Sequence, residues 1–488
     1  MFQLKRDILY HPIRGRVVYD AIVAALSYAL VEGLIFVAGH VPPHPHEWFI
    51  YAGLIVGINF GFGVYGRYKV SSTMTKTALL SASVILASVT LLILDIPAWQ
   101  LTATSLYTVL LLVLPRWFLS VSRGQLLSSG AFQLIHDNDP ILVVGGGGYI
   151  GTHVVEQLLK TNNRVRVFDT FYYGKQVFDE IKSKNLEIVK GDVTDVYILT
   201  KALSNIRAVV HLAGIVGDPA AALDDELTRH LNIVTTRMVK ESVKGLGIPR
   251  LIFSSSCSVY GAADHKVNEN SVLNPVSLYA QTKIDAEQEI LQDTYDLFHP
   301  TVLRFATVFG HSRRMRFDLV ANLFTAQAYQ NGLVTVKGSG QWRPFIHVSD
   351  IARAIVMTLH APLEKVSRQV FNVGDDRLNT TIGKLAETVK TVVKKSQYGK
   401  LVKVTINDEV DDPRNYHVSF DKIQKTLGFR AETTLKTGIS EMYQHFLNGD
   451  YQKPFTDPLY SNLEMTKLIR KEFHSDAYRK THFSLLAK

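Results

Sequence analysis

A tyrosine and a lysine, Tyr279 and Lys283, have the types and the spacing of a proton-transfer pair. On a helix, residues i and i+4 share one face, so these two side chains would point together. A lysine ammonium beside a phenol favours the phenolate and lowers the pKa of the tyrosine. We therefore predict that Tyr279 is a general base that works near neutral pH.

A run of serines, Ser254–Ser256, lies ahead of this pair, directly after an apolar stretch typical of a strand. A serine hydroxyl can donate and accept a hydrogen bond, so one of them could share the proton and hold a substrate. A surface pair would be the better interpretation of Tyr279 and Lys283 taken alone. The serines, and the cofactor site described next, favour catalysis instead.

A glycine-rich loop, Gly145–Gly151, lies between an apolar run at Ile141–Val144 and a helical pattern over about Thr152–Lys160. Glycines let backbone N–H groups approach a pyrophosphate, and a helix N-terminus favours its charge. The next strand, Arg164–Asp169, ends in an acid that would accept hydrogen bonds from the ribose hydroxyls. The same carboxylate would repel a 2′-phosphate, so we expect NAD as the cofactor rather than NADP.

Further apolar strands alternate with helical stretches at Ala208–His211, Leu251–Ser254 and Thr301–Arg304. This rhythm predicts an α/β fold with a doubly wound parallel sheet of the Rossmann type. Residues at the carboxyl ends of such strands face the ligand crevice, where the serines would lie.

Residues from about 140 to 450 resemble the extended short-chain dehydrogenase/reductases of the nucleotide-sugar epimerase/dehydratase group. The resemblance implies that a smaller C-terminal substrate-binding subdomain follows the sheet, and that the protein forms a homodimer. The stretches that carry the resemblance, in the family's order, are Gly145–Gly151, Asp169, Gly191-Asp192, His211–Gly214, Ser254–Gly261, Tyr279 with Lys283, Arg304–Gly310, Gln341–Asp350, Phe371–Gly374 and Asp412–Arg414.

The family's catalytic positions fall on Ser256, Tyr279 and Lys283. The family often has Asn where this chain has Thr307. The identity of the sugar is therefore not predicted. Arg343 and Arg414 would bind the nucleotide diphosphate through their planar guanidinium groups. The substrate contacts implied are Ser256, Thr307, Asn322, Arg343 and Arg414. The cofactor contacts expected are Gly145, Gly148, Tyr149, Ile150, Gly151, Asp169, Asp192, Val193, Leu212, Ala213, Gly214, Tyr279 and Lys283.

The two residues after Ser256 bear on the reaction. Family dehydratases have an Asp-Glu pair there and the related decarboxylases a Glu, whereas this chain has Cys257 and Ser258. The difference favours a 4-epimerase acting on a UDP-sugar or a polyprenyl-linked sugar in cell-surface glycan synthesis. A 4,6-dehydratase, another NAD-dependent sugar oxidoreductase and a non-catalytic NAD-binding membrane scaffold stay as alternatives. Cys257 is expected to be a packing residue.

The first 125 residues are almost all apolar and predict a four-helix transmembrane domain, followed by a linker over 126–139. Each apolar run approaches the roughly 20 residues of a spanning helix. Basic loops alternate with loops lacking Lys and Arg, which predicts a cytoplasmic (inner) membrane protein with both termini and the catalytic domain cytoplasmic. The segment resembles that of membrane-bound UDP-sugar dehydratases. The predicted spans are 17–38, 48–65, 77–94 and 101–121.

The formal net charge of +9 is spread along the chain. Because no basic cluster with a nucleic-acid-binding motif occurs, we expect membrane lipid rather than nucleic acid as a partner. The single cysteine, Cys257, excludes an intrachain disulfide and a thiolate zinc site, and no metal site is expected. A basic tail over 451–488 has no motif, so its role stays open.

Overall fold

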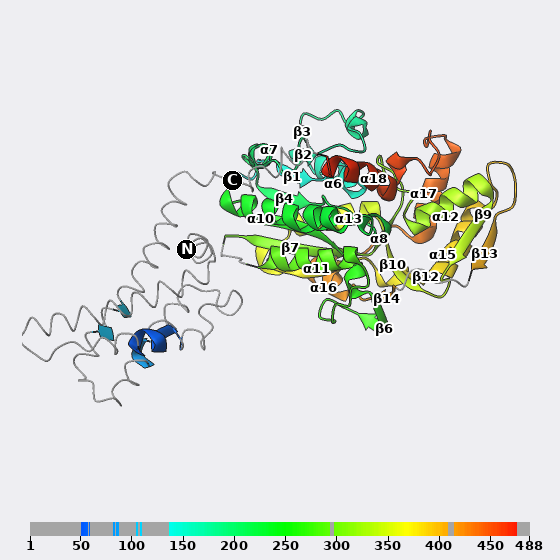
Figure 1. Cartoon of the computed structure of the whole chain (residues 1–488). Coiled ribbons are helices and arrows are strands. Elements are labelled where there is room, and N and C mark those ends of the chain that lie inside the picture. The colour runs from blue at the N-terminus through cyan, green and yellow to red at the C-terminus, as the bar shows by residue number, and fades with distance from the viewer. Residues whose placement is uncertain are drawn as a thin grey trace, which may run out of the picture. The chain divides into compact units, whose positions relative to one another are not determined.

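The computed structural model describes residues 50–56, 58, 82, 84–86, 104–105, 108–109, 136–292, 297–407 and 414–475. The chain divides into two compact units, residues 1–132 and 133–488, and the elements described below belong to the second (Figure 1). Most residues of the four predicted spans and of the predicted linker lie outside the described residues. Within the part that is described, no helix is both long enough and apolar enough to span a bilayer.

Seven parallel strands form the central sheet, in the order β3-β2-β1-β4-β5-β7-β11. The chain runs from β1 outward to β3, then crosses back to β4 on the other side of β1. This reversal leaves a crevice beyond the carboxyl ends of β1 and β4, and it confirms the predicted doubly wound sheet. The strands are β1 (Ile141–Val144), β2 (Val165–Asp169), β3 (Leu186–Lys190), β4 (Ala208–His211), β5 (Arg250–Ser256), β7 (His299–Phe305) and β11 (Val370–Val373).

Helices cover both faces of this sheet, which explains why β1 is apolar throughout. Ile141 and Val143 pack in one core cluster with α6 (Tyr149–Lys160) and α13 (Val348–His360). Leu142 and Val144 pack on the opposite face. The helices on that face are α7 (Val196–Ala202), α10 (Thr235–Gly245) and α11 (Leu278–Leu291). A strand buried on both faces shows no alternation of apolar and polar residues.

A smaller subdomain has its own core, formed largely by α12 (Val320–Asn331), α15 (Ile382–Val393) and α17 (Leu435–Leu447). Its strands are β8 (Thr307–Phe309), β10 (Trp342–His347) and β12 (Asn379–Thr381) in one sheet, and β9 (Leu333–Lys337) with β13 (Lys403–Asn407) in another. A third small sheet pairs β6 (Ala262–Val267) with β14 (Asn415–Val418). Shorter helices are α8 (Asp218–Ala221), α9 (Asp225–Arg229), α14 (Leu363–Val366) and α16 (Asp421–Leu427).

The last described helix, α18 (Asn462–Phe473), belongs to the segment whose role the sequence left open. It packs beside α8 rather than extending away from the domain (red in Figure 1). Part of the predicted tail is therefore an ordered element of the second unit.

Candidate active site

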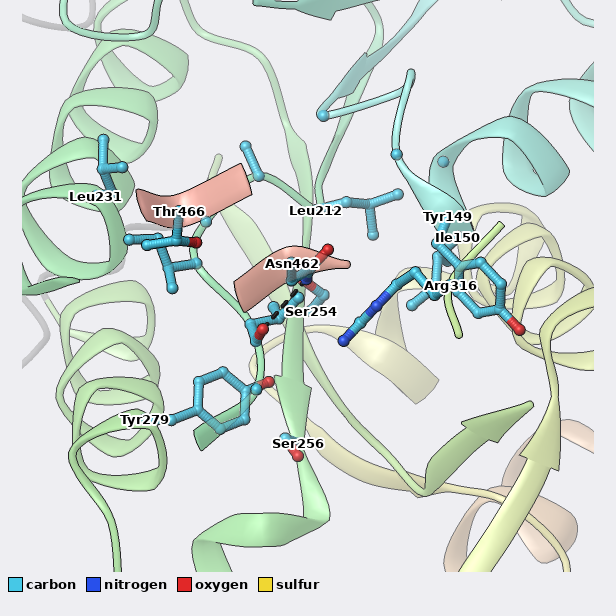
Figure 2. Close-up of a pocket in the computed structure, with 18 of the residues that line it drawn as sticks. Tyr149, Ile150, Leu212, Leu231, Ser254, Ser256, Tyr279, Arg316, Asn462 and Thr466 are labelled. Carbon is cyan, nitrogen blue, oxygen red and sulfur yellow. Dashed lines mark hydrogen bonds between the residues drawn. The ribbon is translucent and has the colours of Figure 1, made fainter. Parts of the chain in front are cut away.

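A cavity of about 330 Å³ lies at the carboxyl ends of β1, β2, β4 and β5. Figure 2 shows Tyr279 and Ser256 in the same cavity as Tyr149 and Arg316. The cavity brings together most residues predicted for the site. These are Gly145, Gly148, Tyr149, Ile150, Gly151, Asp169, Asp192, Val193, Leu212, Ala213, Gly214, Ser256, Tyr279, Lys283, Thr307 and Arg414.

The glycine loop forms a cradle at the N-terminus of α6. Gly145 has φ +82°, and a Cβ there would lie 2.7 Å from the backbone nitrogen of Ala213. A Cβ on Gly151 would collide with the carbonyl oxygen of Gly145. Gly148 precedes the helix without any side-chain cap, so α6 presents free backbone N–H groups to a ligand. This arrangement fits the diphosphate of a dinucleotide.

Asp169 ends β2 and borders the same cradle. One carboxylate oxygen accepts a hydrogen bond from the Gly147 backbone at 2.9 Å, and the other accepts one from the Phe171 backbone at 2.7 Å. Burial raises the pKa of Asp169, and these two hydrogen bonds oppose the rise. Each oxygen keeps a further lone pair, so the predicted contact with the ribose hydroxyls is compatible with this geometry.

The predicted catalytic residues come together from two elements. Tyr279 and Lys283 lie one turn apart on α11, which Ser277 caps by accepting a hydrogen bond from Ala280 N at 3.2 Å. The Lys283 ammonium donates to the Ser254 carbonyl oxygen at 3.0 Å and lies 5.9 Å from the centre of the Tyr279 ring. Ser256 is the last residue of β5 and lines the cavity.

The predicted direction of the Tyr279 pKa shift is wrong. Burial raises the pKa of Tyr279, and the nearby Asp218 carboxylate raises it further. A hydrogen bond with the Ser256 side chain acts in the opposite direction but is smaller. Burial also lowers the pKa of Lys283 to about 8. Desolvation, which the one-turn spacing does not reveal, therefore dominates both shifts.

The sequence model of the NAD dependent epimerase/dehydratase family matches residues 141–374. These residues form a domain of that family. Its NAD dependence agrees with the predicted cofactor. The epimerase/dehydratase domain supplies the sheet, the glycine cradle and the three residues predicted to be catalytic, whereas α18 lies beyond its end.

Similar proteins include enzymes of more than one reaction. A putative UDP-glucose 4-epimerase of Methanocaldococcus jannaschii is 26% identical over 317 residues, covering 64% of this chain and 99% of that protein. UDP-glucuronic acid decarboxylase 6 of Arabidopsis thaliana is 28% identical over 329 residues, covering 64% and 90%. The structure of MoeE5 in complex with UDP-glucuronic acid and NAD is 26% identical, with a TM-score of 0.55 over 64% of this chain and 99% of that one.

A buried network supports the catalytic end of the epimerase/dehydratase domain from below. Glu287 on α11 binds the Arg304 guanidinium through two hydrogen bonds of 2.9 and 2.6 Å. Glu287 also accepts a hydrogen bond from the Ser255 hydroxyl of β5, and Arg304 donates to the Tyr260 hydroxyl at 2.9 Å. The network joins β5 and α11, so it fixes the positions of Ser256 and Tyr279 relative to each other.

Two predicted substrate contacts do not line the cavity. Asn322 is fully buried: its amide donates to Tyr149 Oη at 3.1 Å and to the Arg316 carbonyl oxygen at 2.8 Å, and accepts from Gly310 N at 3.0 Å. Arg343 is also buried and donates to the carbonyl oxygens of Trp342 and Arg414. Both side chains support neighbouring segments, because their polar atoms are already used within the fold.

Arg414 does line the cavity, and its guanidinium lies 2.7 Å from the Asp218 carboxylate. Cys257 packs in the core, donates to the Arg304 carbonyl oxygen at 3.3 Å, and has its pKa raised by burial. A buried thiol of raised pKa is unreactive, which confirms the packing role predicted for it.

Several residues that border the cavity were not predicted. They include two arginines from the loop before α12 and several residues of α18. A local signal for α18 exists, because Ser461 and Glu464 form a helix-start pattern and Met465, Ile469 and Phe473 recur every four residues. Nothing local indicates where that helix packs. Among the residues missed are Arg314, Arg316, Asn462, Thr466, Ile469 and Phe473.

Proposed function

We propose that this chain is an NAD-dependent nucleotide-sugar 4-epimerase. The observation that carries the proposal is the distribution of acids around the cavity. Among the described residues, the only carboxylates that line it are Asp169 and Asp192, both beside the cofactor cradle. At the catalytic end Ser256, Tyr279 and Lys283 line the cavity, and the nearby Asp218 carboxylate does not line it and is paired with Arg414.

This distribution of carboxylates favours removal and return of hydrogen at one carbon over dehydration or decarboxylation. The residues that follow Ser256 are Cys257 and Ser258, and both are buried. A 4,6-dehydration needs a second acid–base pair at neighbouring carbons, which carboxylates usually supply. Loss and return of hydrogen at C4 needs one proton acceptor, and Tyr279 can fill that role.

When bound, NAD would accept a hydride from C4 of the sugar and give it back to the opposite face. Tyr279 would take the proton of the C4 hydroxyl as that carbon becomes a ketone, and would return it afterwards. This role requires the Lys283 ammonium and the positive nicotinamide of bound NAD to favour the phenolate against the rise in pKa that burial causes. Ser256 would hold the same hydroxyl, since its side chain is a hydrogen-bond partner of Tyr279. Lys283 places a positive charge near the Tyr279 phenol, while its ammonium donates a hydrogen bond to the Ser254 carbonyl oxygen. The proton and the hydride are both restored, so the sugar is isomerised without net oxidation.

The substrate class proposed is a UDP-sugar. Support comes from MoeE5, whose structure contains UDP-glucuronic acid, and from the 4-epimerase name of the archaeal relative. The test is incubation of the purified full chain with UDP-glucose, UDP-glucuronic acid and dTDP-glucose, followed by NMR of the products. We expect the C4 epimer of a UDP-sugar. A 4-keto-6-deoxy sugar or release of carbon dioxide would overturn the proposal.

We further propose that residues 1–125 hold the enzyme at the cytoplasmic face of a membrane, where it would serve glycan assembly on polyprenyl carriers. The support is the alternation of basic and non-basic loops between the apolar runs. Release of the full chain from membranes by a salt wash would contradict the anchor. Equal turnover of a soluble UDP-sugar and the matching polyprenyl-diphosphate sugar would argue against a lipid-linked substrate. The homodimer stays a prediction.

A further inference from the structure

The helix α18 forms one wall of the cavity. Ile469 and Phe473 pack in an apolar cluster that includes Ile215, Leu227 and the catalytic Tyr279. At its C-terminal end, Arg470 and His474 contact the Asp224 carboxylate at 3.0 and 2.7 Å. The helix is therefore attached to the segment that follows β4.

Asn462, the first residue of α18, joins three segments around the cavity. Its side-chain oxygen accepts hydrogen bonds from the Tyr173 hydroxyl at 3.0 Å and from the Arg314 guanidinium at 2.6 Å. Its side-chain nitrogen donates to the Val216 carbonyl oxygen at 3.1 Å. These partners follow β2, precede α12 and follow β4, so a single buried amide connects all three.

Arg314 is a buried cation that faces the cavity without a carboxylate partner. Its side chain is 4% exposed, and its guanidinium lies 3.5 Å from the centre of the Tyr173 ring. Within the described residues it forms no ion pair, and its Nε atom has no hydrogen-bond partner. Burial lowers the pKa of Arg314 to about 10. A guanidinium held in this way is costly unless an anion joins it.

The loop that carries Arg314 lies against the start of α6. The Tyr149 hydroxyl donates to the Gly310 carbonyl oxygen at 2.6 Å, and the Ser312 hydroxyl donates to the Tyr149 carbonyl oxygen at 2.8 Å. Arg313 pairs with Glu156 on the same helix. Because α6 begins at the glycine cradle, this packing brings Arg314 to the cavity that the cradle lines. Figure 2 shows Asn462 above Ser254 in this cavity.

We propose that Arg314, positioned by Asn462 and Tyr173, binds the diphosphate of NAD, and that α18 thereby retains the cofactor between turnovers. The proposal rests on the NAD-dependent function proposed above. The diphosphate would be bound both by backbone N–H groups of the cradle and by the Arg314 guanidinium. A retained cofactor suits a reaction that returns its hydride to the same sugar.

The test compares three variants of the full chain. Arg314→Gln removes the charge, and Asn462→Ala removes the side chain that positions it. Lys467→Gln is the matched control, because Lys467 is exposed on the same helix and contacts only Glu464. We would measure the dissociation constant for NAD, the rate of NAD release after rapid dilution, and the dissociation constant for UDP. A charged hydrogen bond to phosphate predicts NAD binding at least tenfold weaker in Arg314→Gln.

In Asn462→Ala we expect NAD to be released several-fold faster, with UDP binding unchanged in every variant. Should Arg314→Gln not fold, as judged by its melting transition, Arg314→Lys and Asn462→Ala carry the test, with weaker NAD binding and faster NAD release expected. NAD binding and release equal to those of Lys467→Gln would overturn the proposal while leaving the epimerase function standing. Weaker UDP binding with unchanged NAD binding would also overturn it, because the guanidinium would then serve the substrate diphosphate. A wild-type chain that binds no NAD would overturn both proposals.

Discussion

Two sides of the cavity differ in how far apart in the sequence their residues lie. We call the glycine loop Gly145–Gly151, the ends of the strands and the Tyr279/Lys283 turn the floor. The roof consists of Arg314, Arg316 and the cavity-facing residues of α18. Each part of the floor is encoded by neighbours in sequence, since a strand, a tight turn and a helix follow one another. The roof forms only when a loop and a distant helix meet at Asn462. Chemistry is therefore expected to depend on the floor, whereas NAD binding is expected to need both the cradle in the floor and the roof.

The strongest way to break this comparison is Tyr279→Phe. Removal of the phenolic hydroxyl leaves the C4 hydroxyl without a proton acceptor, so turnover should fall about 10³-fold. Binding of NAD should stay within about twofold of wild type, because the hydroxyl is not needed by the glycine cradle or the roof. Product formation and NAD content of the purified protein are the measurements. Unchanged turnover would show that Tyr279 is not the proton acceptor, whereas no product from either protein would support the non-catalytic scaffold.

Glu287→Gln tests the support beneath the floor. The substitution leaves the buried Arg304 without its carboxylate, which should lower the free energy of unfolding by about 3 kcal/mol. Lys266→Gln is the matched control, because it removes an exposed pair with Asp376 and should cost less than about 1 kcal/mol. Denaturant unfolding of both variants provides the comparison. Equal losses would mean that the Glu287 network carries no special part of the stability.

Gly151→Ala tests the cradle itself. Its new Cβ would overlap the backbone of Gly145 and Gly146, so the loop must shift and NAD binding should weaken about 100-fold. Gly245→Ala, on α10, is the matched control because a Cβ there meets no atom within 4 Å. That control should bind NAD as the wild type does. Similar NAD affinities in the two variants would show that close approach at the cradle is not required.

Lys283 gives a pH dependence with a defined sign. Its folded-state pKa of about 8 lies below the ordinary value of 10.5, so above pH 8 the unfolded chain binds more protons than the folded one. Stability should therefore rise between pH 8 and 10 relative to Lys283→Met, by at most about 1.4 kcal/mol per pH unit. Thermal or denaturant unfolding of both proteins across this range measures it. Parallel pH profiles would contradict the lowered pKa, and would mean that Lys283 is not desolvated as the rest of the floor is.

The sequence predicts the floor well because its signals are local. The strand Ile141–Val144 and the strand Ala208–His211 have the predicted bounds, and the helix after the glycine loop begins at Tyr149, three residues earlier than predicted. The helix begins earlier because its first turn, from Tyr149, is part of the glycine loop. Ser256 lies at the end of its strand, which is two residues longer than the predicted run at that end.

The failures share one cause, which is that burial depends on the whole fold. Asn322 and Arg343 lie in motifs that resemble substrate contacts, yet neighbouring segments use their polar atoms. The pKa of Tyr279 rises because packing removes water from its phenol, which spacing on a helix cannot show. The amphipathic pattern of α18 could have predicted a helix but not that Asn462 would meet Arg314.

The order in which the chain is synthesised gives Asn462 a further significance. A ribosome adds every residue of the floor, from Gly145 to Lys283, before it adds α18. The growing polypeptide thus passes through a stage in which the floor has been synthesised but α18, which completes the roof, has not. If Arg314 has the proposed role, retention of NAD is acquired after the Tyr279/Lys283 turn has been synthesised.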